Sequence, residues 1–193
     1  IFFDVVRRYF QYCGYTVKYV QNITDVDDKI IARAQEENTT TDDIAKQYIQ
    51  HFRNDCEALG VLPPDAIPKA SEYIDPMVAL IKKLVDIGFA YVAEGNVFFE
   101  TAKDREYGIL SGKGTDLHHM EIGERVSEGI QQLKKDPRDF SLWKPAKPGE
   151  PRWESPWGPG RPGWHTECVA MSIKELGKEF DIHAGGIDLI FPH

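Results

Sequence analysis

Two stretches near the end of the chain combine residue types that can bind a metal ion or a small molecule. The first, GRPGWHTECVAM (160–171), places Trp164, His165 and Cys168 within five residues. The second, DIHAGGIDLIFPH (181–193), contains two more histidines, His183 and His193. Thiolate and imidazole are the ligands that zinc prefers, and a zinc site needs about four ligands, or three and an open position. One shared zinc site is therefore a hypothesis that the sequence raises.

Taken singly, the same residues have simpler explanations. A lone Cys168 is commonly a small buried apolar residue, and a lone His183 or Trp164 is commonly structural. The chain has no CxxC or HExxH spacing, so residue chemistry alone leaves zinc open. The acidic run 25–28 matches a calcium loop only superficially, because the required glycine and final glutamate are missing. Calcium is not expected there.

The surroundings of these residues favour a combined site. Cys168 is placed in the first turns of a helix that opens from a glycine-rich loop, where the helix dipole favours thiolate. His183 ends a short strand, FDIH (180–183), beside a Gly-Gly loop that lets a ligand approach the backbone. Loops at the carboxyl ends of parallel strands are where α/β domains bind ligands.

The elements that position these residues begin with a helix, a strand and a second helix. Residues 2–13 repeat apolar side chains at helical spacing before Gly14, and YTVKYV (15–20) alternates as a strand does. Asn22, Thr24 and Asp25 then supply capping groups for a helix that starts DVDDKIIARAQ. This order predicts an α/β domain with a parallel sheet.

The middle of the chain has a different character. Helices are predicted over 40–60 and 72–88, and a hairpin over 90–101. Residues 144–163 are so rich in proline and glycine that they predict an extended loop. We therefore expect three parts: 1–60 as the first part of the α/β domain, 61–143 as an insertion, and 144–193 as its second part.

Composition describes an ordinary globular protein. Hydrophobic residues make up 41% of the 193 residues, and no apolar run is long enough to cross a membrane. Three widely spaced cysteines indicate a reducing compartment, so we expect a cytoplasmic protein. The net charge of −8 argues mildly against a surface that coats nucleic acid. Because the chain begins inside a helical pattern and stops after a proline, it is expected to be a fragment.

Three long segments closely resemble the cysteinyl-tRNA synthetases, a class I aminoacyl-tRNA synthetase family. They are VQNITDVDDKI (20–30), DFSLWKPAKPGEPRWESPWGPGRPGWHTECVAM (139–171) and DIHAGGIDLIFPH (181–193). ALGVLPPD (58–65), GILSGK (108–113) and GERV (123–126) agree as well. The resemblance implies a Rossmann-like catalytic domain with an inserted mixed α/β connective segment. It also implies ATP with Mg²⁺, L-cysteine and tRNA(Cys) as substrates, and no membrane.

The resemblance also assigns roles to individual residues. Cys168 and His193 match two ligands of a zinc ion that holds the substrate thiol. Thr24, Trp164 and His183 match the amino-acid pocket, and Gly186 and Asp188 match contacts to the adenosine ribose. No ligand role is carried over for His165.

Several family features are absent from these 193 residues. The HIGH-type and KMSKS-type motifs, two further zinc ligands and the anticodon-reading domain are not present, so no catalytic residue is assigned. Two other functions stay open. One is a ligase that transfers cysteine to an aminosugar by the same chemistry, and the other is a zinc-stabilised module with no enzymatic activity.

Overall fold

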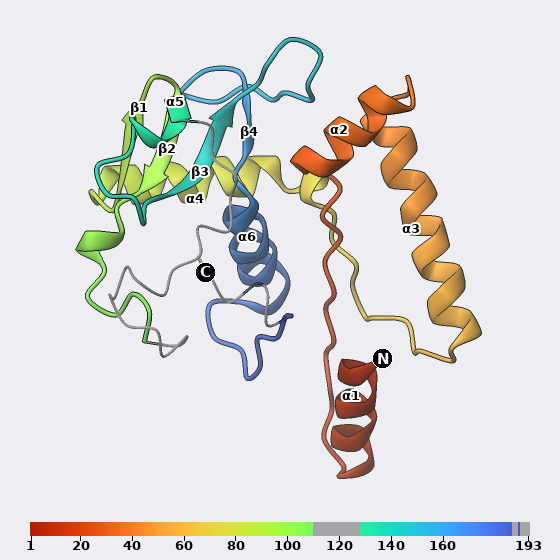
Figure 1. The fold of residues 1–193 in the computed structure, drawn as a ribbon. Helices are drawn as coiled ribbons and strands as arrows, with labels where there is room; N and C mark the ends of the chain where they lie inside the picture. The colour runs from red at the N-terminus through yellow and green to blue at the C-terminus, as the bar shows by residue number, and fades with distance from the viewer. Residues whose placement is uncertain (110–127, 187–188, 190–193) are drawn as a thin grey trace. The chain divides into compact units, whose positions relative to one another are not determined.

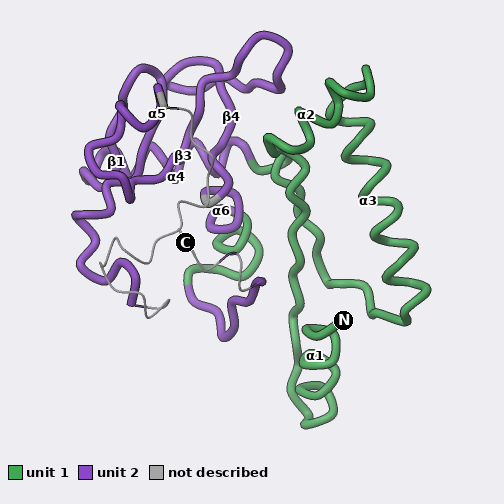
Figure 2. Tube along the Cα trace, viewed as in Figure 1, with its two compact units in different colours: residues 1–73, 171–178 green, residues 74–170, 179–193 purple. Residues whose placement is uncertain are grey.

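A computed structural model describes residues 1–109, 128–186 and 189 of the chain. These residues divide into two compact units, shown in Figure 2. Unit 1 comprises 1–73 and 171–178, and unit 2 comprises 74–170 and 179–193. Within the described ranges, none of the helices could span a bilayer.

Helices dominate unit 1: the helices predicted over 2–13 and 40–60 are confirmed to within two residues, and the one predicted to start at residue 25 begins at Asp28. The helices α1, α2 and α3 span Phe2–Tyr12, Asp28–Glu36 and Thr41–Ala58 (Figure 1). Side chains cap the last two: Asp27 accepts a hydrogen bond from Lys29 N, and Thr40 accepts one from Asp43 N. A short 3₁₀ helix, η1, covers Ala70–Glu72. The pair α2 and α3 buries a small apolar core of Ile31, Ala34, Ile44 and Ala45.

The strand predicted over 15–20 is wrong as a continuous strand. Its last residue, Val20, forms an isolated parallel bridge with Ala66, and Ile23, three residues further on, forms another with Lys69. The backbone bonds that hold them include Gln21 N to Ala66 O at 3.1 Å and Ile23 N to Pro68 O at 2.8 Å. Because proline has no N–H, Pro68 cannot donate and the ladder stays incomplete. Parallel pairing in the described residues is limited to these bridges.

The turn that follows this segment is fixed by one carboxylate. Asp25 accepts hydrogen bonds from Ser71 N at 2.9 Å and from Ser71 Oγ at 2.5 Å. These bonds tie the segment that carries Thr24 to η1. The backbone of Thr24 is therefore held on both sides, by the bridge at Ile23 and by the hydrogen bonds of Asp25.

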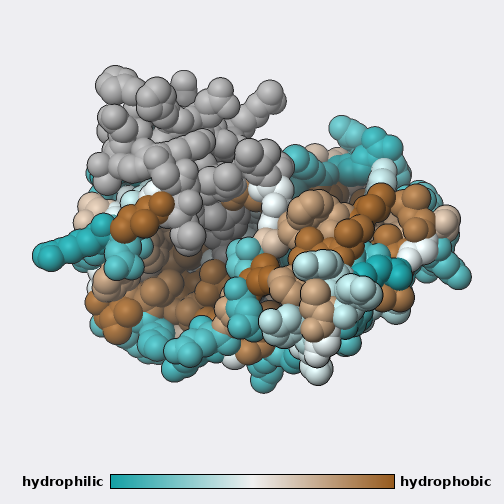
Figure 3. Space-filling view, turned by 90° about the horizontal axis from the view of Figure 1, so that it is seen from below, coloured by the Kyte–Doolittle hydropathy of each residue, from teal (hydrophilic) through white to brown (hydrophobic). Residues whose placement is uncertain are grey.

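The amphipathic pattern of α1 predicts the helix correctly, but its apolar side is not the buried side. Phe2, Val5 and Tyr9 are 71%, 59% and 63% exposed, and hydrophobic residues at the surface are visible in Figure 3. Instead, Asp4 and Arg7 are buried. Arg7 Nη1 donates to Pro63 O at 2.7 Å, and Leu62 N donates to Asp4 Oδ1 at 3.1 Å.

The hydrogen bonds of Asp4 and Arg7, which we call the polar anchor, make the stability of unit 1 depend on pH. The pKa of Asp4 lies below its ordinary value, first because Arg8 donates a hydrogen bond to the carboxylate and also because Leu62 N does. A lowered pKa stabilises the fold above the unfolded value of about 3.9, and this stabilisation is lost as the pH falls further. We expect Asp4→Asn to lack this acid-dependent step in urea unfolding followed by helical circular dichroism.

The control for this prediction is Asp42→Asn, which removes an exposed carboxylate from α3. Its unfolding free energy should keep the wild-type decline below about pH 4. An identical pH profile for Asp4→Asn and wild type would show that the anchor contributes nothing.

Unit 2 is built on a four-stranded antiparallel sheet in the order β1-β2-β3-β4. Helix α4 (Ile74–Asp86) packs against β1 and lies across one face of the sheet (Figure 1). Five residues with no exposed surface fill the sheet interior and the interface of the sheet with α4. They are Met77, Ile81, Val97, Phe98 and Trp143. The strands span Ala90–Ala93, Asn96–Phe99, Phe140–Pro145 and Gly160–Pro162. The chain is thus mixed α/β, but the sheet in its described residues is antiparallel and starts with the predicted hairpin, and the parallel sheet expected around residues 15–20 is not formed there.

The hairpin predicted over 90–101 is confirmed. Strands β1 and β2 pair in register from Ala90 with Phe99 to Ala93 with Asn96. The two turn residues, Glu94 and Gly95, have φ of 49° and 77°, as a type I′ turn requires. Beyond the hairpin, the remaining helical elements are η2 (Thr101–Lys103), α5 (Glu128–Gln131) and α6 (Trp164–Leu176).

The proline- and glycine-rich segment is less irregular than predicted. Its ends belong to β3 and β4, and Trp153 and Gly160 exchange two backbone hydrogen bonds of 2.8 and 2.9 Å. Arg161 Nε lies 3.3 Å from Glu150 Oε2, and both side chains are less than a tenth exposed. The second predicted strand, 180–183, is absent from the described residues, which run there without regular structure.

Candidate functional site

The described candidate residues are divided between the two units. Thr24 belongs to unit 1, whereas Trp164, Cys168, His183 and Gly186 belong to unit 2. Asp188 and His193 lie outside the described residues, as does the side chain of His165. No group of three potential metal ligands is formed by the residues that the structure describes.

The start of α6 is held by strand β3. Gly163 N donates to Leu142 O at 2.8 Å, and Thr166 Oγ1 donates to the same carbonyl oxygen at 3.1 Å. Thr166 N also donates to Gly163 O at 3.1 Å. Trp164 is the first residue of this helix and Cys168 follows one turn later, so β3 sets the position of both.

This attachment depends on two glycines that let β4 approach β3 closely. A Cβ atom on Gly163 would lie 1.9 Å from Ser141 O. One on Gly160 would lie 2.4 Å from both Lys144 O and Trp143 Nε1. Sequence reasoning missed Gly163 and Thr166 as positioning residues. The only available signal was the density of glycine before the helix, which does not say which backbone atoms come close.

Cys168 is a half-buried thiol whose ionisation is opposed by its surroundings. Burial raises the pKa of the Cys168 thiol, and the adjacent Glu167, which is fully buried, raises it further. The expectation that the helix N-terminus lowers this pKa is therefore wrong for the chain by itself, because desolvation and a neighbouring carboxylate outweigh the dipole. A positive charge beside the sulfur would be needed to hold it as thiolate at neutral pH.

His183 and Gly186 lie in an exposed segment after α6. The imidazole ring of His183 has its centroid 6.1 Å from that of Phe180. Among the described residues, this ring contact is the one interaction that orients His183, and its contact with an amino-acid substrate stays a prediction.

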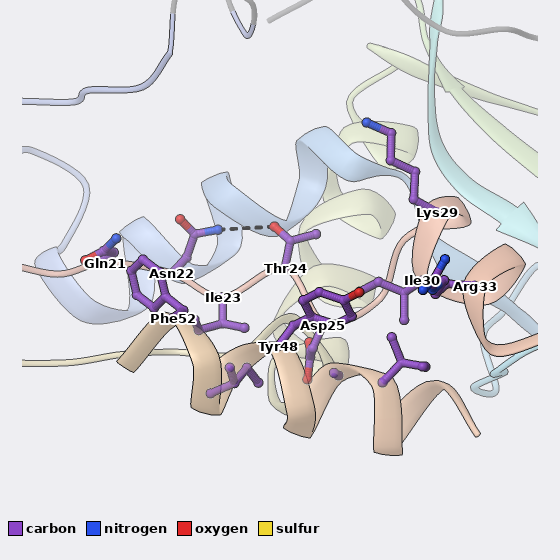
Figure 4. A pocket seen from close by; sticks show the side chains of 13 residues that line it. Gln21, Asn22, Ile23, Thr24, Asp25, Lys29, Ile30, Arg33, Tyr48 and Phe52 are labelled. Atoms are coloured by element: carbon purple, nitrogen blue, oxygen red, sulfur yellow. Dashed lines mark hydrogen bonds between the residues drawn. The ribbon is translucent and has the colours of Figure 1, made fainter. Parts of the chain in front are cut away.

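Thr24 lines a pocket within unit 1, which we call the α2–α3 pocket (Figure 4). It is an open pocket of about 590 Å³, lined by residues 21–25 and by side chains of α2 and α3. The hydroxyl of Thr24 accepts a long hydrogen bond of 3.5 Å from Asn22 Nδ2. Pockets of 300–1,000 Å³ are those that commonly hold small ligands.

Comparison with known proteins gives one consistent result. A family model described as tRNA synthetases class I (C) catalytic domain matches residues 1–193. A cysteine–tRNA ligase of Desulforamulus reducens is 58% identical over 100% of this chain and 39% of its own length. Those of Carboxydothermus hydrogenoformans and Aquifex aeolicus are 53% and 51% identical over the whole chain, which covers 41% and 38% of each. The chain thus spans about two fifths of the curated relatives it matches.

Proposed function

Because this chain belongs to the family of class I tRNA synthetase (C) catalytic domains, we propose that the complete protein joins L-cysteine to tRNA(Cys) at the expense of ATP. The observation that carries this proposal is the match of the family over residues 1–193. Relatives that share at least half of their residues with the whole chain and are called cysteine–tRNA ligase support it. A cytoplasmic location follows from the proposed substrates.

The proposed reaction has two steps. The cysteine carboxylate attacks the α-phosphorus of ATP, a new P–O bond forms, the bond from the α-phosphorus to the bridging oxygen of the β-phosphate breaks, and pyrophosphate leaves. A hydroxyl of the terminal ribose of tRNA then attacks the carbonyl carbon, and AMP leaves. Both steps depend mainly on positioning and on stabilisation of phosphate charge.

We propose roles for the candidate residues within this reaction. Thr24, Trp164 and His183 would contact the amino acid, and Gly186 and Asp188 would contact the ribose of the adenylate. Division of the chain at 60 and 143 into a catalytic domain with an insertion is part of the same proposal. The attachment of α6 to β3 supports a fixed position for Trp164, because both bonds from Gly163 and Thr166 converge on Leu142 O.

Cys168 and His193 would hold a zinc ion. The donor chemistry fits, because a half-buried thiol with a raised pKa becomes a thiolate when a cation lies beside it. Bound zinc would supply a soft Lewis acid that distinguishes the thiol of cysteine from the hydroxyl of serine. A pocket of ordinary shape discriminates poorly between two side chains that differ by one atom.

Replacement of Cys168 by serine tests this assignment in the complete protein. We expect Cys168→Ser to lose bound zinc and most of the preference for cysteine over serine, because a serine hydroxyl is a poor zinc ligand. Zinc content and the ratio of kcat/KM for the two amino acids in ATP–pyrophosphate exchange are the measurements. Cys13→Ser, at an exposed position on another element, is the matched control. Retention of both zinc and selectivity by Cys168→Ser would refute the assignment.

The function itself is tested with labelled cysteine and ATP in the complete protein, offered either tRNA or an aminosugar. Label on tRNA is the expected result. Label on the sugar alone would assign the protein to the related cysteine ligases, and no adenylate formation at all would indicate a module that is not an enzyme.

A further inference from the structure

Helix α6 is a single helix that contributes residues to both units. Residues 164–170, which include Cys168, fall in unit 2, and residues 171–176 fall in unit 1 (Figure 2). The helix contains neither glycine nor proline, the residue types that commonly bend a helix. The contacts that hold its last turn within unit 1 therefore also act on the side chains two turns earlier.

Within unit 1, Glu175 holds the last turn of α6. Its carboxylate accepts a hydrogen bond from the hydroxyl of Tyr73, and its backbone carbonyl oxygen accepts one from Lys18 Nζ. We call these two bonds the α6 clamp. Tyr73 and Glu175 are half-buried, whereas the bond from Lys18 is exposed. The first bond is therefore the stronger part of the clamp, because water competes with it less.

Both donors of the α6 clamp are joined to the segment that carries Thr24. Lys18 lies on the same stretch of backbone, six residues before Thr24. Tyr73 follows Ser71 by two residues, and Ser71 donates to the carboxylate of Asp25 from its N–H and from its hydroxyl. Asp25 directly follows Thr24 in the chain. Within unit 1, the end of α6 is thus tied to the backbone on both sides of Thr24.

Glu175 and Cys168 lie on the same side of α6. They are seven residues apart, which is close to two turns of a helix with about 3.6 residues per turn. Side chains at this spacing project in nearly the same direction. Because Tyr73 holds the carboxylate of Glu175, it fixes the rotation of α6 about its own axis. That rotation decides the direction of the Cys168 thiol.

We propose that Tyr73 and Glu175 are positioning residues for the amino-acid substrate, because their hydrogen bond holds α6 at the rotation in which Cys168 acts on the same amino acid as Thr24. This inference rests on the proposed function, in which Thr24 contacts the amino acid and Cys168 holds zinc. Neither Tyr73 nor Glu175 touches the substrate in this scheme. Loss of their bond should therefore weaken binding of cysteine and leave binding of ATP unchanged.

The test uses variants of the complete protein in cysteine-dependent ATP–pyrophosphate exchange. Tyr73→Phe removes the donor, and Glu175→Leu removes the acceptor. Each should raise the KM for cysteine about tenfold, the effect of losing one hydrogen bond to a charged group, with an unchanged KM for ATP. Glu175→Gln should keep a KM near that of wild type, because its amide oxygen still accepts a bond from Tyr73.

The double variant Tyr73→Phe/Glu175→Leu shows whether the two residues act as one pair. Its KM for cysteine should rise about as much as in either single variant, because all three lose the same bond. Multiplication of the two single effects would overturn the inference, since each residue would then act by itself. An equal rise in the KM for cysteine and for ATP would also overturn it, since that result indicates general damage to the fold.

Equilibrium binding gives a second readout that needs no turnover. We expect the Kd of zinc-loaded Tyr73→Phe protein for L-cysteine, measured without ATP, to rise by about the same factor as the KM. Its zinc content should equal that of wild type, because Cys168 and His193 are still present. Loss of zinc from this variant would overturn the inference, because the bond would then maintain the metal site rather than position the substrate.

Two control variants match the changes in residue type. Tyr12→Phe removes a hydroxyl from a residue that is 88% exposed at the end of α1, and Lys174→Leu places leucine at the exposed position beside Glu175. Both should keep the wild-type KM for cysteine. An unchanged KM in Tyr73→Phe would overturn the inference alone. Absence of exchange in wild type would refute the proposed function, and this inference with it.

Discussion

Gly163→Ala should abolish the close pairing of β4 with β3 and cost about 3 kcal/mol or more of unfolding free energy. The added methyl group would lie 1.9 Å from the carbonyl oxygen of Ser141, which is backbone and has no rotamer to move into. Relief requires β4 to move away, which breaks the bond from Gly163 N to Leu142 O. The start of α6 would move with it, so we also expect loss of cysteine activation in the complete protein.

Gly129→Ala is the matched control. It lies in α5 of the same unit, and a Cβ at this position would have no atom within 4 Å. Because alanine favours a helix more than glycine does, Gly129→Ala should be neutral or slightly stabilising. Urea unfolding of both variants measures the difference. A Gly163→Ala protein as stable as the Gly129→Ala protein would show that β4 can move away without cost.

Asp139→Ala should cost about 3 kcal/mol or more, because it leaves several donors in the interior of unit 2 without an acceptor. The carboxylate is 1% exposed and accepts four hydrogen bonds. Thr101 N and Thr101 Oγ1 donate at 3.0 Å, Tyr91 OH donates at 2.7 Å, and Asp136 N donates at 3.2 Å. One side chain thereby joins β1, η2 and the turn that precedes β3.

A graded series separates this cause from a general loss of charge. Tyr91→Phe removes one of the four donors and should cost about 1 kcal/mol. Asp139→Asn keeps the shape but replaces one acceptor by a donor, and its cost should fall between the other two. Asp86→Asn, at a carboxylate that is 57% exposed and paired with Lys82, should stay within about 0.5 kcal/mol of wild type. Equal unfolding free energies across the series would contradict the proposed role of Asp139.

Local sequence signals predicted the elements that local interactions decide. The hairpin at Glu94 and Gly95 and the helix that starts after Thr40 follow from residue types within a few positions of each end. The burial of α1 does not, because the partner that buries Asp4 and Arg7 lies more than fifty residues away in the sequence. Apolar spacing gives the period of a helix, but a distant backbone decides which side is covered.

The candidate site divides in the same way. Cys168 was predicted on the helix that carries it, because the glycine-rich run and the apolar pattern mark its start. The direction in which the pKa of Cys168 is shifted was not predicted, since it depends on burial and on the fully buried Glu167. Gly163 was missed as a positioning residue because its role depends on a close approach of the backbone. A methyl group at this position would lie only 1.9 Å from Ser141 O.

The positions of the four tryptophans have an optical consequence. All of them, Trp143, Trp153, Trp157 and Trp164, lie between β3 and the start of α6, in unit 2. Intrinsic tryptophan emission from this chain is therefore a reporter of unit 2 alone. The wholly buried Trp143, 6.1 Å from the ring of Trp157, should emit at shorter wavelength than an indole in water. A red shift of the emission on denaturation would report when the β3–β4 pair opens. Circular dichroism would report mainly on the helices, which are other elements.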